Sequence, residues 1–173
     1  MKRLLASLAC LGVLCLPACS DDSSSSADPP SPTPSSSEPT STPTEEGETP
    51  EEFVRRWVEV DREMQNSGET QEYRQITKGC TACRGVADQV DAIYKAGGYV
   101  KTDGLQIAQV RVGKPDRNGE VEARLMVRSA PTEYVEEAGG AVQNLPGGRV
   151  TYLLTLHEAD DSWVLVLLER LAT

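Results

Sequence analysis

The stretch PEEFVRRWVEVDREM, residues 50–64, has the hydrophobic period of an amphipathic helix. Its apolar residues recur at intervals of three or four and share one face: Phe53, Trp57, Val60 and Met64. A proline followed by two glutamates is typical of a helix start, and Gly68 predicts the end. Core packing explains the Phe53/Trp57 stripe more simply than a ligand shelf does, so this helix is expected to lie against a sheet.

Two shorter helices are predicted after Gly68. Thr70 can cap one that carries Tyr73 and Ile76 and stops near Gly79. The next begins around Thr81 and ends at Gly97-Gly98. Its apolar face consists of Val86, Val90, Ile93 and Tyr94.

The period changes to that of β-strands after Gly98. Residues 120–129 alternate cleanly, with one apolar face and one face that carries Glu122, Arg124 and Arg128. Further strands are predicted over 105–112, 150–157 and 163–170, and a looser connection with a strand near Tyr134 spans 131–149. The last two strands are partly apolar on both faces and are expected to lie centrally beneath the helices. Three helices followed by an antiparallel meander indicate an α+β domain.

A set of ordered motifs carries a resemblance to known proteins. The motifs are Glu52-Phe53 through Trp57, Cys80-Thr81-Ala82-Cys83, Ile93-Tyr94-Lys95-Ala96-Gly97-Gly98, and Thr151-Tyr152-Leu153-Leu154 with Asp161-Ser162-Trp163. With these the chain resembles the nuclear transport factor 2-like (cystatin-like) superfamily, and more closely an uncharacterised family of actinobacterial lipoproteins. The resemblance implies a cone, with three N-terminal helices packed on a curved antiparallel sheet of about four strands. It implies no activity.

The N-terminus reads as a lipoprotein leader. Lys2 and Arg3 precede an uncharged, Leu-rich stretch over residues 4–16, which is too short to span a bilayer but fits a signal peptide. Leu16-Pro17-Ala18-Cys19 resembles the bacterial lipobox. We therefore expect a signal peptide over residues 1–18, cleavage between Ala18 and Cys19, and a diacylglycerol on Cys19 that holds the protein to the outer face of the cytoplasmic membrane. The alternative is a plain secreted protein.

Residues 19–50 are predicted to comprise the lipidated Cys19 and a disordered tether. Ser, Thr and Pro dominate this segment, which carries seven acidic residues and no Lys or Arg. The net charge of −10 becomes −12 when Lys2 and Arg3 leave with the leader, and residues 51–173, the predicted domain, carry only −5 of it. No basic stripe is visible in the sequence, so nucleic acid is not an expected partner.

Cys80 and Cys83 are the two cysteines that remain in the domain, and an oxidising compartment predicts a disulfide between them. A staple that ties the second helix to the third is the favoured interpretation. Thiol–disulfide exchange is the alternative, because a helix start can activate a thiol. A zinc site needs two more ligands, and the single histidine, His157, is distant in sequence, so no metal is expected.

The superfamily cone implies an apolar pocket, for which the candidate lining residues are Trp57, Tyr73, Tyr94 and Tyr152. Some superfamily members are isomerases with an Asp or His base and a Tyr donor, so the resemblance leaves an isomerase-like enzyme as a further alternative, with Asp91 and these tyrosines as conceivable residues. His157 is expected to be exposed, and Glu133, Glu136 and Glu137 to form a solvated helical turn. No catalytic residues or cofactor are predicted. The leading hypothesis is a non-catalytic binding or accessory domain that acts on a cell-envelope protein or a small apolar ligand.

Overall fold

The computed structural model describes residues 47–172, and the first helix begins where the sequence predicts. Helix α1 spans Pro50–Ser67. The Thr49 hydroxyl accepts from the Glu52 amide (3.3 Å), and the Glu52 carboxylate accepts from the Thr49 amide (2.9 Å), which is a reciprocal capping box. The expected cleavage site at Ala18 and the lipidation site at Cys19 lie outside the described residues.

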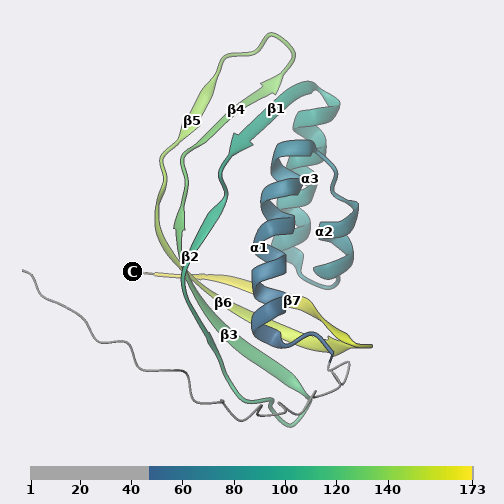
Figure 1. The fold of residues 1–173 in the computed structure, drawn as a ribbon. Coiled ribbons are helices and arrows are strands. Elements are labelled where there is room, and N and C mark those ends of the chain that lie inside the picture. The colour runs from purple at the N-terminus through teal and green to yellow at the C-terminus, as the bar shows by residue number, and fades with distance from the viewer. Residues whose placement is uncertain (1–46, 173) are drawn as a thin grey trace, which may run out of the picture. The chain divides into compact units, whose positions relative to one another are not determined.

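Two further helices follow α1 and lie beside it on the same side of the sheets (Figure 1). Helix α2 spans Gln71–Ile76 and is shorter than predicted, while α3 spans Thr81–Lys95. No helix among residues 47–172 is long and apolar enough to cross a bilayer.

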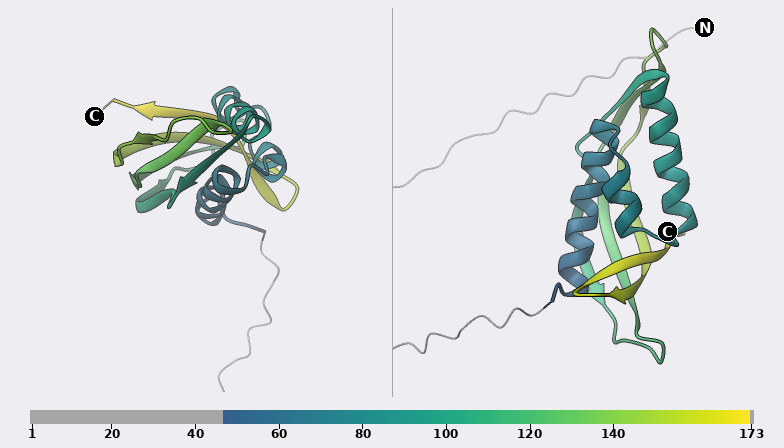
Figure 2. Two further views of the ribbon diagram at one scale, coloured as in Figure 1. Left: turned by 90° about the horizontal axis from the view of Figure 1, so that it is seen from above. Right: turned by 90° about the vertical axis from the view of Figure 1, so that its right-hand side faces the viewer.

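Seven strands form two antiparallel sheets. Strands β2 (Leu105–Val112), β3 (Glu120–Ser129), β6 (Gly148–Ala159) and β7 (Ser162–Leu171) make one sheet in the order β2-β3-β6-β7. Strands β1 (Gly97–Thr102), β4 (Thr132–Glu137) and β5 (Gln143–Leu145) make the other, in the order β1-β4-β5. Figure 2 shows both sheets on one side of the domain and the helices on the other. The α+β architecture predicted from the sequence is therefore confirmed.

The two sheets are successive parts of one bent surface. Strand β1 continues into β2. Strand β3, which pairs with β2, continues into β4, which pairs with β1. The same two chain segments therefore pair on both sides of the bend. Gly104 lies at this bend with φ +74°, and a Cβ there would stand 2.9 Å from the Cβ of Arg62 on α1. Glycine is needed at this position because it permits both the left-handed backbone and the close approach to α1.

The core lies between α1 and the inner face of the four-stranded sheet. The alternation predicted for residues 120–129 holds, because Val121, Ala123, Leu125 and Val127 are all buried. Each stands opposite an inward residue of β6, as Ala123 does with Leu154. Phe53 and Trp57 of α1 belong to the same buried cluster, so the stripe is core, as the sequence favoured.

Three details differ from the sequence prediction. Strand β7 is at the sheet edge and not central. Its apolar inner face is explained by α2 and α3, which pack on it. Strands β1 and β5 were not predicted, because the Gly-Gly start of β1 and the three-residue length of β5 give no readable alternation.

The chain enters the domain through Glu48. Its carboxylate accepts two hydrogen bonds from Arg56 (2.8 and 2.7 Å), and its backbone carbonyl accepts from the Trp163 indole (2.8 Å). The Arg56 guanidinium lowers the pKa of Glu48, because it stabilises the charged carboxylate more than partial burial penalises it. These contacts hold the residues just before α1 against the β6–β7 turn.

The bend at Gly104 generates a testable prediction. Gly104→Ala combines a left-handed backbone with a contact against Arg62, whereas Gly119→Ala meets the same kind of backbone (φ +78°) with no atom within 4 Å. We expect Gly119→Ala to lower the free energy of unfolding by about 1 kcal/mol and Gly104→Ala by at least about twice that. Urea denaturation of both variants measures the difference, and equal losses would show that the approach to α1 is not tight.

Candidate functional site

Three of the four aromatic residues predicted to line a pocket gather at one place inside the cone. Trp57 of α1 and Tyr73 of α2 are 2% and 1% exposed, and Tyr152 of β6 is partly buried and packed against the same core. Tyr94 also packs against the core, but near the C-terminal end of α1, where its hydroxyl donates to the backbone carbonyl of Gln65 (3.0 Å). Trp57 and Tyr73 fill the interior and do not surround an open space.

Asp61 is a buried carboxylic acid in this cluster. It is 6% exposed, and its Oδ2 accepts a hydrogen bond from Gln65 Nε2 (2.7 Å). Among residues 47–172 it has no cationic partner within salt-bridge distance. Burial raises the pKa of Asp61 to about 6, against the opposing effect of the Gln65 hydrogen bond.

The charge of Asp61 affects the pKa of two neighbouring tyrosines. Burial raises the pKa of Tyr73, and the negative charge of Asp61 raises it further. Burial also raises the pKa of Tyr152, and Asp61 adds to that rise while Arg170 opposes it. The Trp57 indole N–H lies near the Tyr73 hydroxyl and opposes this rise in the pKa of Tyr73. It makes no hydrogen bond of normal geometry, alone among the buried side-chain polar atoms of the described residues. The four residues Asp61, Tyr73, Tyr152 and Trp57 are hereafter the Asp61 cluster.

Asp91, which the sequence left conceivable for an isomerase-like site, lies outside this cluster. It is exposed and pairs with Arg74 (2.6 Å), which lowers the pKa of Asp91. Asp61 lies four residues after Trp57 and three before Met64, and so falls on the apolar face of α1. An acidic residue at a core position of an amphipathic helix is the signal that could have identified it.

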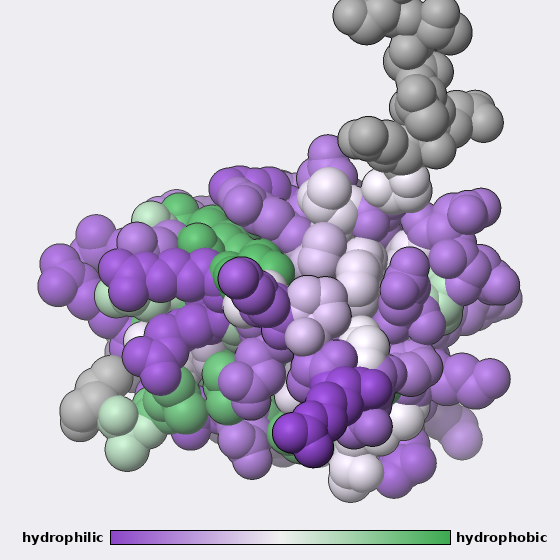
Figure 3. All heavy atoms as spheres, turned by 90° about the horizontal axis from the view of Figure 1, so that it is seen from below, coloured by the Kyte–Doolittle hydropathy of each residue, from purple (hydrophilic) through white to green (hydrophobic). Residues whose placement is uncertain are grey.

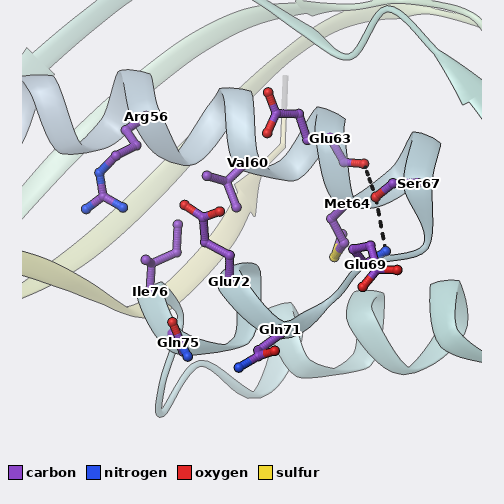
Figure 4. Close-up of a pocket in the computed structure, with 10 residues that line it drawn as sticks. All are labelled: Arg56, Val60, Glu63, Met64, Ser67, Glu69, Gln71, Glu72, Gln75 and Ile76. Carbon is purple, nitrogen blue, oxygen red and sulfur yellow. Dashed lines mark hydrogen bonds between the residues drawn. The ribbon is translucent and has the colours of Figure 1, made fainter.

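An open depression lies outside the cone, between α1 and α2. Its volume is about 550 Å³. Figure 4 shows its ten lining residues, which are mainly polar and include three glutamates: Arg56, Val60, Glu63, Met64, Ser67, Glu69, Gln71, Glu72, Gln75 and Ile76. The Ser67 hydroxyl donates to the Glu63 carbonyl and accepts from the Glu69 amide. The depression therefore has a polar rim, and no residue of the Asp61 cluster lines it.

The disulfide between Cys80 and Cys83 is present and closes the first turn of α3. Cys80 is the N-cap of this helix, and its sulfur accepts from the Cys83 amide (3.1 Å). Both residues thus belong to α3, and the expected tie to α2 comes instead from the Cys80 amide, which donates to the Thr77 carbonyl (3.0 Å). Cys80 and Cys83 are 2% and 0% exposed, so an attacking thiolate has little access to either sulfur.

The remaining sequence candidates lie at the surface. His157 is exposed on β6, opposite Glu120. Glu133, Glu136 and Glu137 lie on strand β4, so the helical turn expected there is wrong. Glu133 accepts a hydrogen bond from the Tyr99 hydroxyl (2.9 Å) and lies 3.6 Å from Lys101. No group of three or more His, Cys, Asp or Glu within residues 47–172 is arranged to hold a metal ion.

The outward face of the four-stranded sheet is both basic and apolar. Since Val121, Ala123, Leu125 and Val127 point inward, the alternate residues of β3 and their partners point outward. We name this surface the outer sheet face; its residues include Arg111, Arg124, Met126, Arg128, Arg149, Thr151 and Leu153. Figure 3, which views the domain from the end that carries the β2–β3 turn, shows hydrophobic patches among hydrophilic side chains on the sheet side.

Comparison with known proteins shows similarity of fold alone. No family model matches the chain. No curated protein matches it either. The intermembrane space region of chloroplast protein ARC6 aligns with a TM-score of 0.53 and 10% identity, over 71% of this chain and 94% of that one.

Two further structures align with lower TM-scores. An uncharacterised protein with a cystatin-like fold from Caulobacter vibrioides gives 0.43, with 9% identity over 69% of this chain and 87% of that one. The protein Aln2 from a Streptomyces species gives 0.44, with 12% identity over 71% and 93%. Three helices on a curved antiparallel sheet are the architecture of the nuclear transport factor 2-like, or cystatin-like, fold class. The narrower lipoprotein family stays a prediction.

The buried carboxyl of Asp61 predicts an unusual dependence of stability on pH. Its folded-state pKa of about 6 exceeds the ordinary value of 3.8, so the folded state binds more protons between these pH values. The free energy of unfolding should therefore fall as pH rises through this window, by about 3 kcal/mol in total. Asp61→Asn, which keeps the acceptor for Gln65, should match wild type near pH 4 and be more stable near pH 7.

Denaturant unfolding from about pH 4 to about pH 7 measures this difference. Asp91→Asn is the matched control, because the pKa of Asp91 is lowered and its charged form is the stabilised one. The control should gain no stability at neutral pH. A variant Asp61→Asn that is less stable than wild type at pH 7 would contradict the prediction.

The burial of the cystine predicts resistance to reduction. Under native conditions we expect dithiothreitol to leave Cys80 and Cys83 unreactive to iodoacetamide, whereas the denatured protein should take up two labels, as mass spectrometry would show. Cys80→Ala with Cys83→Ala should cost about 2 kcal/mol of unfolding free energy, since the closed loop is short. Rapid labelling of the native protein would instead support thiol–disulfide exchange.

Proposed function

We propose that this protein is a membrane-anchored, extracytoplasmic lipoprotein whose folded domain is a non-catalytic binding or accessory module. The lipobox-like sequence before Cys19 and the Ser/Thr/Pro-rich segment that follows support the anchor and the spacer. The partner is a component of the cell envelope or a small apolar ligand.

The packing of the cone interior is the observation that carries the binding role. Trp57 and Tyr73, which would line a ligand pocket of this fold, are at most 2% exposed, as is Phe53 beside them. A site filled by its own side chains offers no room for a substrate next to Asp61. Binding is therefore assigned to the exterior, where the outer sheet face and the depression between α1 and α2 are open to solvent.

The Asp61 cluster favours a second candidate, an isomerase-like enzyme. A carboxyl with a pKa of about 6 next to two tyrosines is a plausible general base with nearby hydrogen-bond donors. Asp61 lines none of five depressions found among residues 47–172. Turnover of small apolar carbonyl compounds that is abolished by Asp61→Asn, while their binding persists, would support this candidate over the binding module.

Metabolic labelling tests the proposed anchor. In producing cells given labelled palmitate, we expect wild-type protein to acquire the label and to fractionate with membranes, because two acyl chains give lasting attachment. Cys19→Ser should abolish both. Cys80→Ala with Cys83→Ala is the control, since it removes two other cysteines and should leave the label unchanged. Unlabelled wild-type protein in the culture medium would refute the lipoprotein assignment.

Crosslinking in intact cells tests the binding role. A defined envelope component captured by wild-type protein and lost on substitution of exterior residues would support the accessory module. Capture that instead depends on Asp61 would favour a site inside the cone.

A further inference from the structure

Four arginines from three strands meet on the outer sheet face. They stand in two directly opposed pairs, Arg111 with Arg124 across β2 and β3, and Arg128 with Arg149 across β3 and β6. None of the four forms an ion pair or a side-chain hydrogen bond within residues 47–172. Other cations of the domain do form ion pairs, for example Arg56 with Glu48 and Arg74 with Asp88.

This arrangement is unfavourable for the folded domain taken alone. Like charges that stand directly opposite on a sheet repel each other. Residues 51–173 contain twenty acidic residues against fifteen basic ones, so carboxylates to pair with these arginines are abundant in the sequence. Of these, Glu122 lies near one pair but forms no ion pair with it. The concentration of unpaired guanidinium groups on one face of an acidic domain indicates that an external anion pairs with them.

Each arginine pair lines its own depression. Arg111 and Arg124 line one of about 320 Å³ together with Leu153 and Glu122. Arg128 and Arg149 line another of about 430 Å³ with Met126 and Thr151. Arg124 and Arg128 are four residues apart on one strand, which places the two pairs about 13 Å apart. The face therefore offers two cationic positions separated by a small apolar stretch at Met126.

We propose that the outer sheet face binds a linear, phosphate-bearing polymer of the cell envelope, with one phosphate group held by each arginine pair. Planar guanidinium groups match phosphate oxygens with two parallel hydrogen bonds, which lysine does not provide. The sheet bends around the helices, so its outer face is convex (Figure 1). A flexible chain can follow a convex surface, whereas a flat bilayer would touch only its crest. The location of the polymer rests on the proposed extracytoplasmic function.

The two arginine pairs should not contribute equally to the affinity for the polymer. Glu122 lines the depression of Arg111 and Arg124 and reduces its positive potential, whereas no carboxylate lines that of Arg128 and Arg149. We expect the second pair to contribute more to affinity.

The test uses the full chain carrying Cys19→Ser, so that no lipid takes part, and fluorescein-labelled inorganic polyphosphate as the probe. Fluorescence anisotropy should report binding that weakens as salt increases. Arg124→Gln with Arg128→Gln, which removes one arginine from each pair, should weaken binding by about tenfold or more. Arg111→Gln with Arg149→Gln breaks the same pairs from the other strands and should give a similar loss.

Lys78→Gln with Lys95→Gln is the matched control, because it removes the same charge from exposed positions away from the sheet. It should change affinity by no more than about twofold. Orthophosphate should compete only at far higher concentration, because it engages one pair at a time. The arginine variants should keep or raise Tm, since the repulsion between opposed guanidinium groups is relieved.

Three outcomes would overturn the inference: no binding of polyphosphate, an equal loss in the lysine control, or stronger arginine-dependent binding to phosphatidylglycerol vesicles than to polyphosphate. The last would make this a membrane-facing surface. Because the assay needs neither lipid nor cells, its failure leaves the palmitate labelling and crosslinking results untouched. Failure of those experiments likewise leaves the polyphosphate result standing.

Discussion

The burial of α1 in the bend of the sheet is the constraint on which the rest of the structure depends. Phe53, Trp57 and Met64 are almost completely removed from water, and together with Val54 they give α1 an apolar surface wider than one narrow stripe. A flat sheet could cover only one side of such a helix. The bend at Gly104 lets the sheet contact α1 on either side of the turn. Because the helix is enclosed in this way, every residue on its inner surface is withdrawn from water, whatever its chemistry.

The burial of the Asp61 carboxyl is a consequence of that enclosure. Asp61 occupies a core position of α1, and the packing that buries Trp57 and Met64 buries its carboxyl too. A hydrogen bond from Gln65 satisfies one oxygen, but no cation offsets the loss of hydration, so protonation becomes easier. The domain therefore carries a carboxyl that destabilises it at neutral pH. A buried carboxyl with a raised pKa and no cationic partner is a feature that functional sites often have, so the enzymatic candidate depends on this one residue.

The pleat of the four-stranded sheet separates two functions on alternate residues of β3. Leu125 and its inward neighbours make the core, while Arg124 and Arg128 point to solvent on the other side. The strand register determines which side chains are neighbours on the outer sheet face. It places Arg111 opposite Arg124 and Arg128 opposite Arg149. The face that we assign to polymer binding is thus built on the most regular element of the domain, where side-chain positions are well determined.

Much of the fold could be predicted from the sequence because its elements carry strong periodic signals. The start of α1, the extent of α3 and the strands β2 and β3 follow from apolar spacing and from glycine, and the cystine follows from cysteine count and compartment. Strands β1 and β5 escaped prediction because they are short or glycine-rich. Strand β7 was misplaced because an apolar strand looks central in sequence even when helices cover it at an edge.

The sequence alone determined the α+β class, the positions of the main helices and strands, and the placement of Phe53 and Trp57 on the core face of α1. These depend on spacing along the chain, which local backbone geometry converts directly into faces. The tertiary structure decided that these aromatic residues fill the cone, that Asp61 and not Asp91 is the buried acid, and that four arginines form one surface. Those outcomes depend on strand register and on the bend around α1, and both arise from contacts between residues far apart in the chain.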